Sequence, residues 1–331
     1  MQNEFKFWVH LLDTPGPEAL AALQAALAPG IRLTWGRELP ENAGYHVLVG
    51  GRPERQHLMG SPALRMYVIP FAGMPPKARE LLAEFPHIAV HNLHHNASLT
   101  AEMAVALLMS AAKFVVPFDQ DLRRGDWSRR YRHSPALALE GKTALVLGFG
   151  HIGQRVGRAC WALGMRVLGL RRHPEKEDGL DYPAEIYGLP ALNELLPQTH
   201  VLVVTLPATP ETEGLVGAAE LGSMPPGGVL VNVGRGPIVE QAALYQALET
   251  GHLRAAGLDV WYNYPADEPG RKETFPGDYP FHELENLVLS PHRGGGTDET
   301  EALRMQALAG LLNAAAAGKP VPNRVDVELG Y

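Results

Sequence analysis

Three glycines at positions 148, 150 and 153 form the pattern in this chain that most directly indicates chemistry. An apolar run precedes them and an amphipathic segment follows, which predicts a strand, a tight turn and a helix in that order. Gly148 would allow the turn, Gly150 would let a pyrophosphate approach the backbone, and Gly153 would let the helix pack on the strand. The start of that helix would offer N–H groups and the positive end of its dipole to the phosphates. The segment therefore predicts a dinucleotide-binding site.

The composition is that of a globular protein without a nucleic-acid partner. The 331 residues suffice for about two domains of roughly 100–200 residues each. The apolar fraction of 46 % allows each domain a core, and the net charge of −7 argues against nucleic acid. The single cysteine, Cys160, fits a reducing compartment and has the apolar neighbours of a core residue. We find neither a signal peptide nor an apolar run long enough to span a membrane, so a cytoplasmic protein is expected.

Apolar runs, interrupted by glycine and proline, predict two series of alternating strands and helices. This alternation is typical of an α/β fold with doubly wound parallel sheets, Rossmann-like or flavodoxin-like. In the first series we expect strands at residues 5–11, 31–35, 45–49, 64–69 and 87–91, and helices at 17–28 and 76–84. In the second series we expect strands at residues 143–147, 166–170, 201–205, 229–232, 255–258 and 287–289. One long helix over residues 98–118 precedes the second series, and a last helix over 297–317 follows it.

Several segments resemble, in the same order along the chain, those of the D-isomer-specific 2-hydroxyacid dehydrogenases. They are Gly148–Gly153, Thr205–Thr212, Asn232–Pro237, Ala256–Val260 and Ser290–Gly294, and the helical segment Leu99–Ala104 is similar to the interdomain helix of that family. The family includes glyoxylate/hydroxypyruvate reductases, phosphoglycerate dehydrogenases and formate dehydrogenases. The resemblance implies a discontinuous catalytic domain (residues 1–98 plus 296–331), a dinucleotide-binding domain (99–295) and an active site in the cleft between them.

The resemblance also implies roles for three side chains. In this family a hydride passes between a nicotinamide and the carbon that bears the oxygen, while a proton passes to or from that oxygen. His292 matches the general acid/base, and histidine suits this role because its pKa lies near neutrality. Arg235 matches the arginine that polarises the carbonyl and orients the substrate carboxylate. Asp259 matches an aspartate near the nicotinamide carboxamide, with a loop-capping role as the alternative.

Further residues of the matching segments are expected at the cofactor or at the substrate. Cofactor contacts are expected for Gly148, Gly150, His151, Ile152, Gly153, Pro207, Thr212, Val233, Asp259 and Gly294. In the first domain, the turn Ala72–Gly73–Met74 would bind the substrate carboxylate through backbone N–H groups, together with Arg235. Gly50 and Gly51 form a second such turn, for which a substrate role and a plain turn are both open. The histidines in residues 91–96 lack the spacing of a zinc motif, so no metal site is expected.

One departure from the family concerns the partner of the catalytic histidine. The family usually carries a glutamate there, directly before a proline, whereas Tyr264 precedes Pro265 in this chain. We therefore include Tyr264 among the catalytic residues, with Asp267 and Glu268 as alternative partners. Because tyrosine supplies no charge at neutral pH, we expect the pKa of His292 to be lower than in relatives that carry the glutamate.

A second departure concerns the choice of cofactor. NAD-dependent members place an acidic residue at the end of the second strand of the nucleotide domain, where it accepts from the ribose 2′-hydroxyl. Arg171 and Arg172 stand there in this chain. Two arginines would attract a 2′-phosphate, and no carboxylate is expected to repel it. The sequence therefore predicts a preference for NADP(H), with NAD(H) still possible.

Together these features predict the NADP(H)-dependent reduction of a small 2-oxo acid, such as glyoxylate or hydroxypyruvate, to the D-2-hydroxy acid. A phosphoglycerate-type dehydrogenase and a non-catalytic, dinucleotide-sensing protein are the alternatives. The resemblance also implies a homodimer that forms through the nucleotide domain, and residues 118–132 would suit its interface. No nucleic acid and no membrane are expected as partners.

Overall fold

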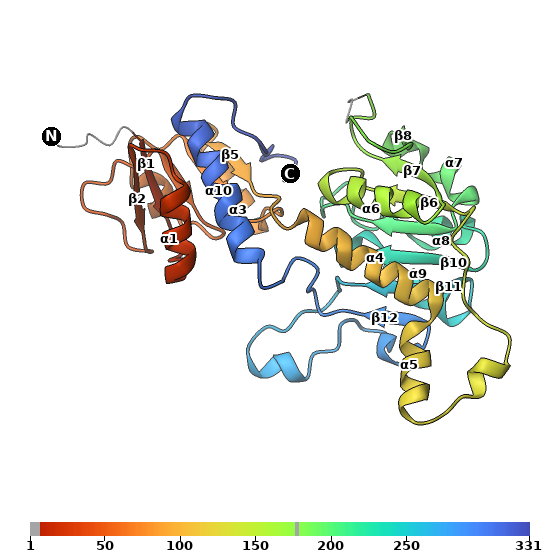
Figure 1. Ribbon diagram of the computed structural model, residues 1–331. Helices are drawn as coiled ribbons and strands as arrows, with labels where there is room; N and C mark the ends of the chain where they lie inside the picture. The colour runs from red at the N-terminus through yellow and green to blue at the C-terminus, as the bar shows by residue number, and fades with distance from the viewer. Residues whose placement is uncertain (1–6, 176–178) are drawn as a thin grey trace. The chain divides into compact units, whose positions relative to one another are not determined.

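A computed structural model describes residues 7–175 and 179–331, which form two compact units. Unit 1 contains the described residues up to Asn96 together with Gly296–Tyr331, and unit 2 contains Ala97–Gly295 (Figure 1). Each unit is built on a parallel sheet with helices between the strands, as the alternating pattern predicted.

The sheet of unit 1 forms from the five runs that were expected as strands. Within the described residues the strands lie side by side in the order β2 (Ile31–Trp35), β1 (Phe7–Leu11), β3 (Val47–Val49), β4 (Met66–Ile69) and β5 (Ala89–Asn92). The expected start of the first strand, at residue 5, lies outside the described residues. This order is flavodoxin-like, and the direction in which strands are added reverses between β1 and β3.

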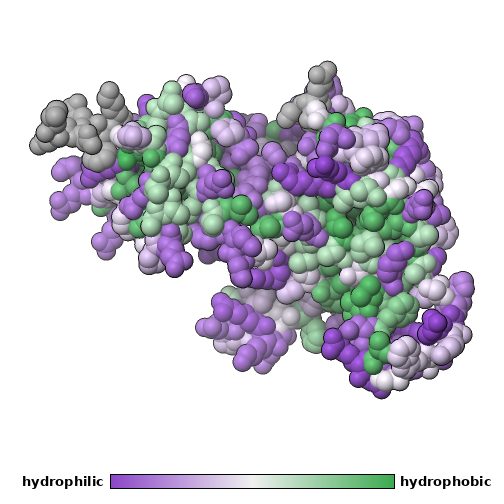
Figure 2. Space-filling model, viewed as in Figure 1, coloured by the Kyte–Doolittle hydropathy of each residue, from purple (hydrophilic) through white to green (hydrophobic). Residues whose placement is uncertain are grey.

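Helices cover both faces of this sheet, because successive side chains of a strand point to opposite faces. Val9 and Leu11 of β1 pack into a core with α1 (Pro17–Ala26) and α10 (Thr300–Ala316). Trp8 points to the other face, whose core includes residues of α2 (Arg55–Met59) and α3 (Pro76–Ala83). The alanine-rich outer surfaces of α1 and α10 colour much of the visible side of unit 1 pale green (Figure 2).

The sheet of unit 2 contains the six expected strands and one more. Among the described residues the order is β12 (Leu287–Leu289), β11 (Leu253–Leu258), β10 (Gly228–Asn232), β9 (Val201–Val204), β6 (Thr143–Leu147), β7 (Arg166–Leu170) and β8 (Glu185–Tyr187). The added strand, β8, is a three-residue edge strand that is only half-buried, so it lacks the apolar run by which the others were predicted. This is the Rossmann order, which reverses between β6 and β9.

Two cores cover the faces of the second sheet. Leu145 and Leu147 of β6 face a core shared with α7 (Leu192–Leu195), α8 (Ala218–Ser223) and α9 (Gln241–Glu249). The alternate residues Ala144 and Val146 face a core shared with α4 (Ala97–Lys113) and α6 (His151–Ala162). Cys160 is fully buried in that second core, where burial raises the pKa of its thiol to about 12. It therefore carries no thiolate at neutral pH.

The expectation of one helix over residues 98–118 is wrong. The helix breaks at Phe114, which has a left-handed φ of +53°, and α5 (Val115–Arg123) continues at 66° to α4. Pro117 explains the break, because a proline in a continuing helix would lack the N–H that bonds to Lys113 and would clash with its carbonyl. No single helix in the described part of the chain could span a membrane by length and hydropathy, although the bent pair α4 and α5 together would pass that test.

The last helix begins later than expected. α10 starts at Thr300 with Glu299 as its N-cap residue, so the expected start at residue 297 is wrong by one turn. Short 3-10 helices join the main elements at Ser128–Tyr131, Leu189–Ala191, Leu196–Gln198, Gly236–Ile238, Pro269–Lys272 and Phe281–Glu283.

Candidate active site

The turn between β6 and α6 is tight and closely packed. Gly148 has a φ of +107°, and a Cβ there would lie 2.9 Å from the backbone nitrogen of Leu206. A Cβ on Gly153 would lie 2.1 Å from the carbonyl oxygen of Gly148, so only glycine allows α6 to approach the turn this closely. At Gly150, the exposed N-cap of α6, a Cβ would meet no described atom within 4 Å. The turn therefore leaves space beside the N-terminus of a twelve-residue helix, which fits a pyrophosphate.

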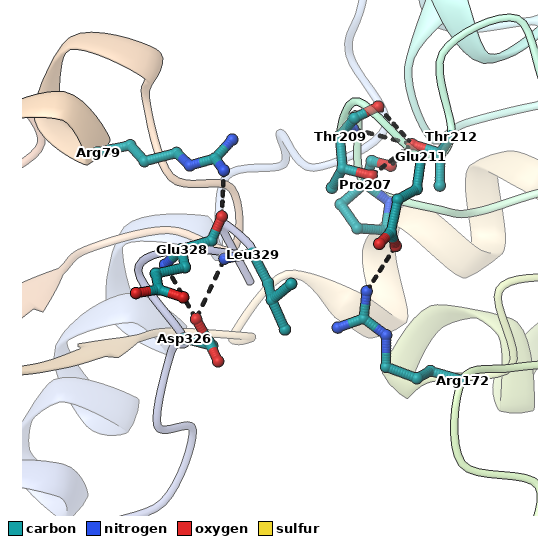
Figure 3. Close-up of polar contacts among 9 residues, drawn as sticks. All are labelled: Arg79, Arg172, Pro207, Thr209, Glu211, Thr212, Asp326, Glu328 and Leu329. Atoms are coloured by element: carbon teal, nitrogen blue, oxygen red, sulfur yellow. Dashed lines mark hydrogen bonds and ion pairs between the residues drawn. The ribbon is translucent and has the colours of Figure 1, made fainter. Parts of the chain in front are cut away.

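The turn lies where ligands bind in sheets of this kind, at the point where the strand order reverses. Thr205, directly after β9, donates its hydroxyl to the carbonyl oxygen of Gly148 at 2.5 Å. Farther along this loop, the buried Thr212 donates its hydroxyl to the carbonyl oxygen of Pro207 at 2.7 Å (Figure 3). Thr212 thus shapes the loop itself, and the contacts of Pro207 and Thr212 with a cofactor stay predictions.

The other expected cofactor residues differ in how much of their side chain is accessible. His151 is exposed in the first turn of α6, whereas Ile152 is half-buried and packs against the core beneath α6. Val233, after β10, is buried in the same core. Val233 could therefore reach a bound dinucleotide only through its backbone.

The arginines after β7 have a counter-ion that the sequence did not reveal. Arg172 forms an ion pair with Glu211, with 2.9 Å between Nη2 and Oε2 (Figure 3). Arg171 donates from Nη2 to the carbonyl oxygen of Pro174 at 3.3 Å. The expectation that no carboxylate opposes a 2′-phosphate is therefore wrong, because the loop after β9 brings Glu211 to Arg172.

The loop after β12, which carries His292, is held by a buried carboxylate. Asp259 follows β11 and is 2 % exposed. Its Oδ1 accepts from the Ser290 hydroxyl at 2.5 Å and from the Arg293 N–H at 2.8 Å. Its Oδ2 accepts from the N–H of Gly294 at 2.8 Å, and a Cβ on Gly294 would lie only 2.7 Å from that oxygen. Asp259 caps this loop, and its contact with a nicotinamide carboxamide stays a prediction.

These bonds support an unusual backbone conformation at His292. Its φ of +58° is left-handed, which is uncommon for residues other than glycine. Asp259 binds backbone N–H groups directly after His292 and the side chain of Ser290 before it. The network therefore fixes the position from which the imidazole projects.

The imidazole of His292 contacts Tyr264. The Tyr264 hydroxyl lies 2.9 Å from Nδ1 of His292, and it also accepts from the backbone N–H of Trp261 at 3.2 Å. The two alternative partners are engaged elsewhere, since Asp267 accepts from the N–H of Gly270 and Glu268 pairs with Arg271. Of the three candidates weighed from the sequence, Tyr264 is the one that lies against the histidine.

The surroundings of His292 disfavour its charged form. Desolvation by neighbouring protein atoms lowers the pKa of His292 although its ring stays partly accessible, and the Arg235 guanidinium lowers it further. Asp259 opposes both effects. Desolvation likewise raises the pKa of Tyr264, so this hydroxyl is protonated at neutral pH.

Arg235 projects from the turn after β10 with an exposed side chain. Asn232 shapes this turn by accepting from the N–H of Gly234 at 3.0 Å and by donating to the carbonyl oxygen of Arg235 at 3.0 Å. A Cβ on Gly236 would lie 2.3 Å from the carbonyl oxygen of Trp261, which explains the glycine after the arginine. The Arg235 guanidinium donates to the carbonyl oxygen of Gly234 at 2.7 Å and is exposed to solvent.

In unit 1 the turn expected at the substrate follows β4. Ala72, Gly73 and Met74 are half-buried, and the carbonyl oxygen of Ala72 accepts from the Asn92 side chain at 2.6 Å. Gly50 has a packing reason of its own, because a Cβ there would lie 2.7 Å from the Leu12 side chain. That contact supports a plain structural turn at Gly50.

Three contributors to the unit 2 site were missed by the sequence reasoning. Ser290 lay within a matched segment but was given no role, and its place two residues before His292 was the available signal. Trp261 donates its backbone N–H to Tyr264 and its indole N–H to the carbonyl oxygen of Ser290, and no sequence signal pointed to it. Glu211 lay within the matched segment Thr205–Thr212, but nothing in the sequence showed that this segment reaches Arg172. Over the described residues, no group of three or more His, Cys, Asp and Glu side chains could hold a metal ion.

Residues 105–294 match the D-isomer specific 2-hydroxyacid dehydrogenase family in its NAD binding domain. A glyoxylate reductase of Aeropyrum pernix is 37 % identical over 239 residues, which cover 70 % of this chain and 67 % of that protein. A D-3-phosphoglycerate dehydrogenase of Archaeoglobus fulgidus is 35 % identical over 234 residues, which cover 70 % of this chain but only 41 % of that protein.

Solved structures resemble the chain over nearly its whole length. A D-isomer specific 2-hydroxyacid dehydrogenase of Xanthobacter autotrophicus, solved with NADPH and MES, has a TM-score of 0.79 and 26 % identity, covering 98 % of this chain and 99 % of that one. An NADPH-dependent glyoxylate/hydroxypyruvate reductase of Sinorhizobium meliloti has a TM-score of 0.76 and 22 % identity, covering 98 % and 100 %. The second likeness concerns the fold alone.

Proposed function

The chain belongs to the D-isomer specific 2-hydroxyacid dehydrogenases, a family of NAD(P)-dependent oxidoreductases, and we propose that it reduces a small 2-oxo acid with NADP(H). Glyoxylate and hydroxypyruvate are the substrates that we favour, with the D-2-hydroxy acid as the product. The observation that carries the proposal is that Arg235, after β10, and His292, after β12, follow strands of the same sheet and are close enough for the arginine to lower the pKa of the histidine.

In this proposal the two side chains divide the chemistry at the substrate oxygen. A dinucleotide held at the Gly148–Gly153 turn would supply the hydride for the carbonyl carbon. Arg235 polarises the carbonyl and orients the carboxylate through its planar, permanently charged guanidinium. His292 gives the proton that the oxygen needs as negative charge develops on it. Tyr264, Asp259 and Ser290 hold His292 for that transfer.

We assign substrate binding to unit 1 and dinucleotide binding to unit 2. The proposed substrate-binding domain contains residues 1–98 plus 296–331, and the proposed dinucleotide-binding domain contains residues 99–295. In unit 1 the backbone N–H groups of Ala72–Met74 are the proposed contacts of the substrate carboxylate. In unit 2 the turn at Gly148–Gly153 fits the pyrophosphate, because its glycines bring the backbone close where side chains would intrude.

The preference for NADP(H) rests on Arg171 and Arg172. A charge-assisted hydrogen bond from a guanidinium suits a 2′-phosphate, and the acidic residue typical of NAD-dependent sites is replaced here. Glu211 works against this preference through its ion pair with Arg172. We therefore propose that NADP(H) is preferred by a modest margin and that NAD(H) is also accepted.

We further propose a homodimer in the cytoplasm, formed through α5 and the loop that follows it. Leu122, Trp127 and Tyr131 in this region are 50 %, 59 % and 82 % exposed. Large exposed apolar side chains of this kind are typical of interface anchors. Sedimentation of the wild type and of Trp127→Glu would test the dimer, since a buried charge should release monomers.

The decisive experiment for the function is NADPH oxidation with a panel of 2-oxo acids. We expect turnover of glyoxylate or hydroxypyruvate, and a loss of about 10²–10⁴-fold in kcat/KM for His292→Ala. His87→Ala, which removes an exposed histidine of unit 1, is the matched control and should leave the rate unchanged. Turnover restricted to phosphohydroxypyruvate would favour the phosphoglycerate-type alternative, which the Archaeoglobus fulgidus relative also suggests. Binding of NADPH without turnover of any acid would favour the dinucleotide-sensing alternative.

A further inference from the structure

The Tyr264 hydroxyl lies between two partners whose chemistry determines where its proton points. The backbone N–H of Trp261, 3.2 Å away, can only donate, so the Tyr264 oxygen must accept there. The other partner, Nδ1 of His292, lies 2.9 Å away and can accept when the imidazole is neutral. The hydroxyl can therefore give its single proton to Nδ1, and the proton of the neutral imidazole is then on Nε2.

No carboxylate on the facing elements competes for Nδ1. The charged groups that act on His292 and Tyr264 are Arg235, from the turn after β10, and Asp259, from the end of β11. Both oxygens of Asp259 already accept from the loop around His292. An Nδ1–H, as a carboxylate partner would favour, therefore has no anionic acceptor at this position.

We propose that Tyr264 is a positioning residue that holds neutral His292 in its Nε2–H tautomer, so that the neutral ring donates a hydrogen bond to the oxygen of a 2-oxo acid and offers no bare Nε2 to a 2-hydroxy acid. This inference rests on the proposed function. A carbonyl oxygen can only accept, which matches Nε2–H in both the neutral and the cationic imidazole. A hydroxy acid must instead give its proton to a bare Nε2, which this tautomer does not offer.

The proton balance of reduction follows from this arrangement. The carbonyl carbon gains a hydride and the carbonyl oxygen gains the Nε2 proton of the imidazolium, which becomes neutral with its remaining proton on Nδ1. Exchange with solvent, to which His292 and Tyr264 are both exposed, then returns the proton to Nε2. Formation of the imidazolium requires the Tyr264 hydroxyl to turn from donor to acceptor, which opposes protonation at Nδ1.

The arrangement separates the effect of pH on binding from its effect on the rate. As pH rises through the pKa of His292, kcat for reduction should fall, because the imidazolium is lost. KM for the 2-oxo acid should stay level, because Nε2–H persists in the neutral ring. In Tyr264→Glu the carboxylate would favour Nδ1–H, so KM should rise with pH and the fall of kcat should move up by about 1–2 pH units.

The first test reads the tautomer without turnover, by ¹⁵N NMR of histidine-labelled protein above the pKa of His292. The signal of His292 is assigned with His292→Ala. We expect the neutral ring of the wild type to be protonated on Nε2, Tyr264→Phe to show both tautomers, and Tyr264→Glu to show Nδ1–H. A wild-type ring protonated on Nδ1 would overturn the inference whatever the enzyme acts on, so this result is separate from any failure of the proposed function.

The second test measures kcat and KM for glyoxylate and for the hydroxy acid product from about pH 5 to pH 9. Level KM with falling kcat in the wild type, and gain of oxidation in Tyr264→Glu, would support the inference. Equal movement of KM and kcat in the wild type would contradict it. NADPH affinity reports whether each variant keeps its fold, and Tyr264→Phe, which changes one atom, serves if the glutamate variant does not fold.

Discussion

The two sheets of this protein reverse their strand order at equivalent points, but glycine and larger residues occupy opposite sides of those points in the two units. In unit 2, Gly148 follows the first strand, β6, and the larger residues Thr205 and Leu206 follow its neighbour, β9. In unit 1, the buried Leu12 follows the first strand, β1, and Gly50 follows its neighbour, β3. Parallel topology alone therefore creates no dinucleotide site.

The helices that follow the first strands differ in the same sense. α6 begins after Gly150 with residues that have backbone N–H groups, whereas α1 begins with Pro17, which has none at that position. A phosphate site in such a sheet therefore requires a glycine turn and an open helix start together. Unit 1 lacks this combination, so core residues can occupy the point where its strand order reverses.

The largest expected effect comes from adding a methyl group at Gly153. Its Cβ would lie 2.1 Å from the Gly148 carbonyl oxygen, so α6 must move away from the turn. We expect Gly153→Ala to lower kcat/KM with NADPH by about 10²-fold, the scale of a 1 Å misplacement, and to destabilise unit 2 by about 1–3 kcal/mol. Gly310→Ala is the control, because that glycine of α10 is exposed and a Cβ there would meet open space. This substitution should raise the free energy of unfolding by about 0.5–1 kcal/mol. Equal NADPH kinetics in Gly153→Ala and wild type would refute the packing argument.

A smaller effect is expected from the charges beside the open site. Glu211→Gln removes the counter-ion of Arg172. We therefore expect the ratio of kcat/KM with NADPH to kcat/KM with NADH to rise about tenfold. Arg172→Gln should lower the same ratio by a similar factor. The exposed ion pair of Arg158 with Asp181 offers a matched control. Asp181→Asn should leave kcat/KM unchanged with either cofactor. An unchanged ratio in both Glu211 and Arg172 variants would remove the basis of the NADP(H) preference.

The smallest effect concerns the closed core of unit 1. His10 of β1 is buried, bonds to Thr34 and stacks on Tyr45, and burial lowers its pKa, with His57 lowering it further and the carbonyl of Gly36 opposing. A folded pKa below the unfolded value means that the stability is present above the unfolded pKa, ~6.5, and is lost as pH falls.

The protection factors of the β1 amides, which are corrected for the intrinsic exchange rate, should therefore fall below about pH 6.5, with a slope of at most about 1.4 kcal/mol per pH unit for one proton. His10→Phe keeps the stacking on Tyr45 and should flatten that slope relative to the wild type. Exchange in β6 of unit 2, whose side chains are all apolar or hydroxyl-bearing, is the internal reference. The same slope in His10→Phe and wild type would assign the pH dependence to other groups.

The sequence by itself determined the features that depend on local chemistry. Strands buried on both faces appear as apolar runs, so both sheets could be predicted, and β8 was missed because it is short and half-exposed. The turn at Gly148–Gly153 could be predicted because each glycine answers a local steric demand. The break at Phe114 was missed although Pro117 was visible, because the apolar period continued through it.

Tertiary structure decided the contacts between side chains that are distant along the chain. The sequence suggested Tyr264 as the partner of His292 and left Asp267 and Glu268 as alternatives, and only the folded loop brings Tyr264 to His292. Arg172 follows β7 and Glu211 follows β9, and these two strands flank β6 in the sheet. Both loops leave the sheet at the carboxyl ends of its strands, which allows Glu211 to reach Arg172. The physical reason is the same in both cases. The position of a turn is set by its own residues, but the side chains that it contacts are set by the neighbouring strands, whose ends lie beside it in the folded sheet.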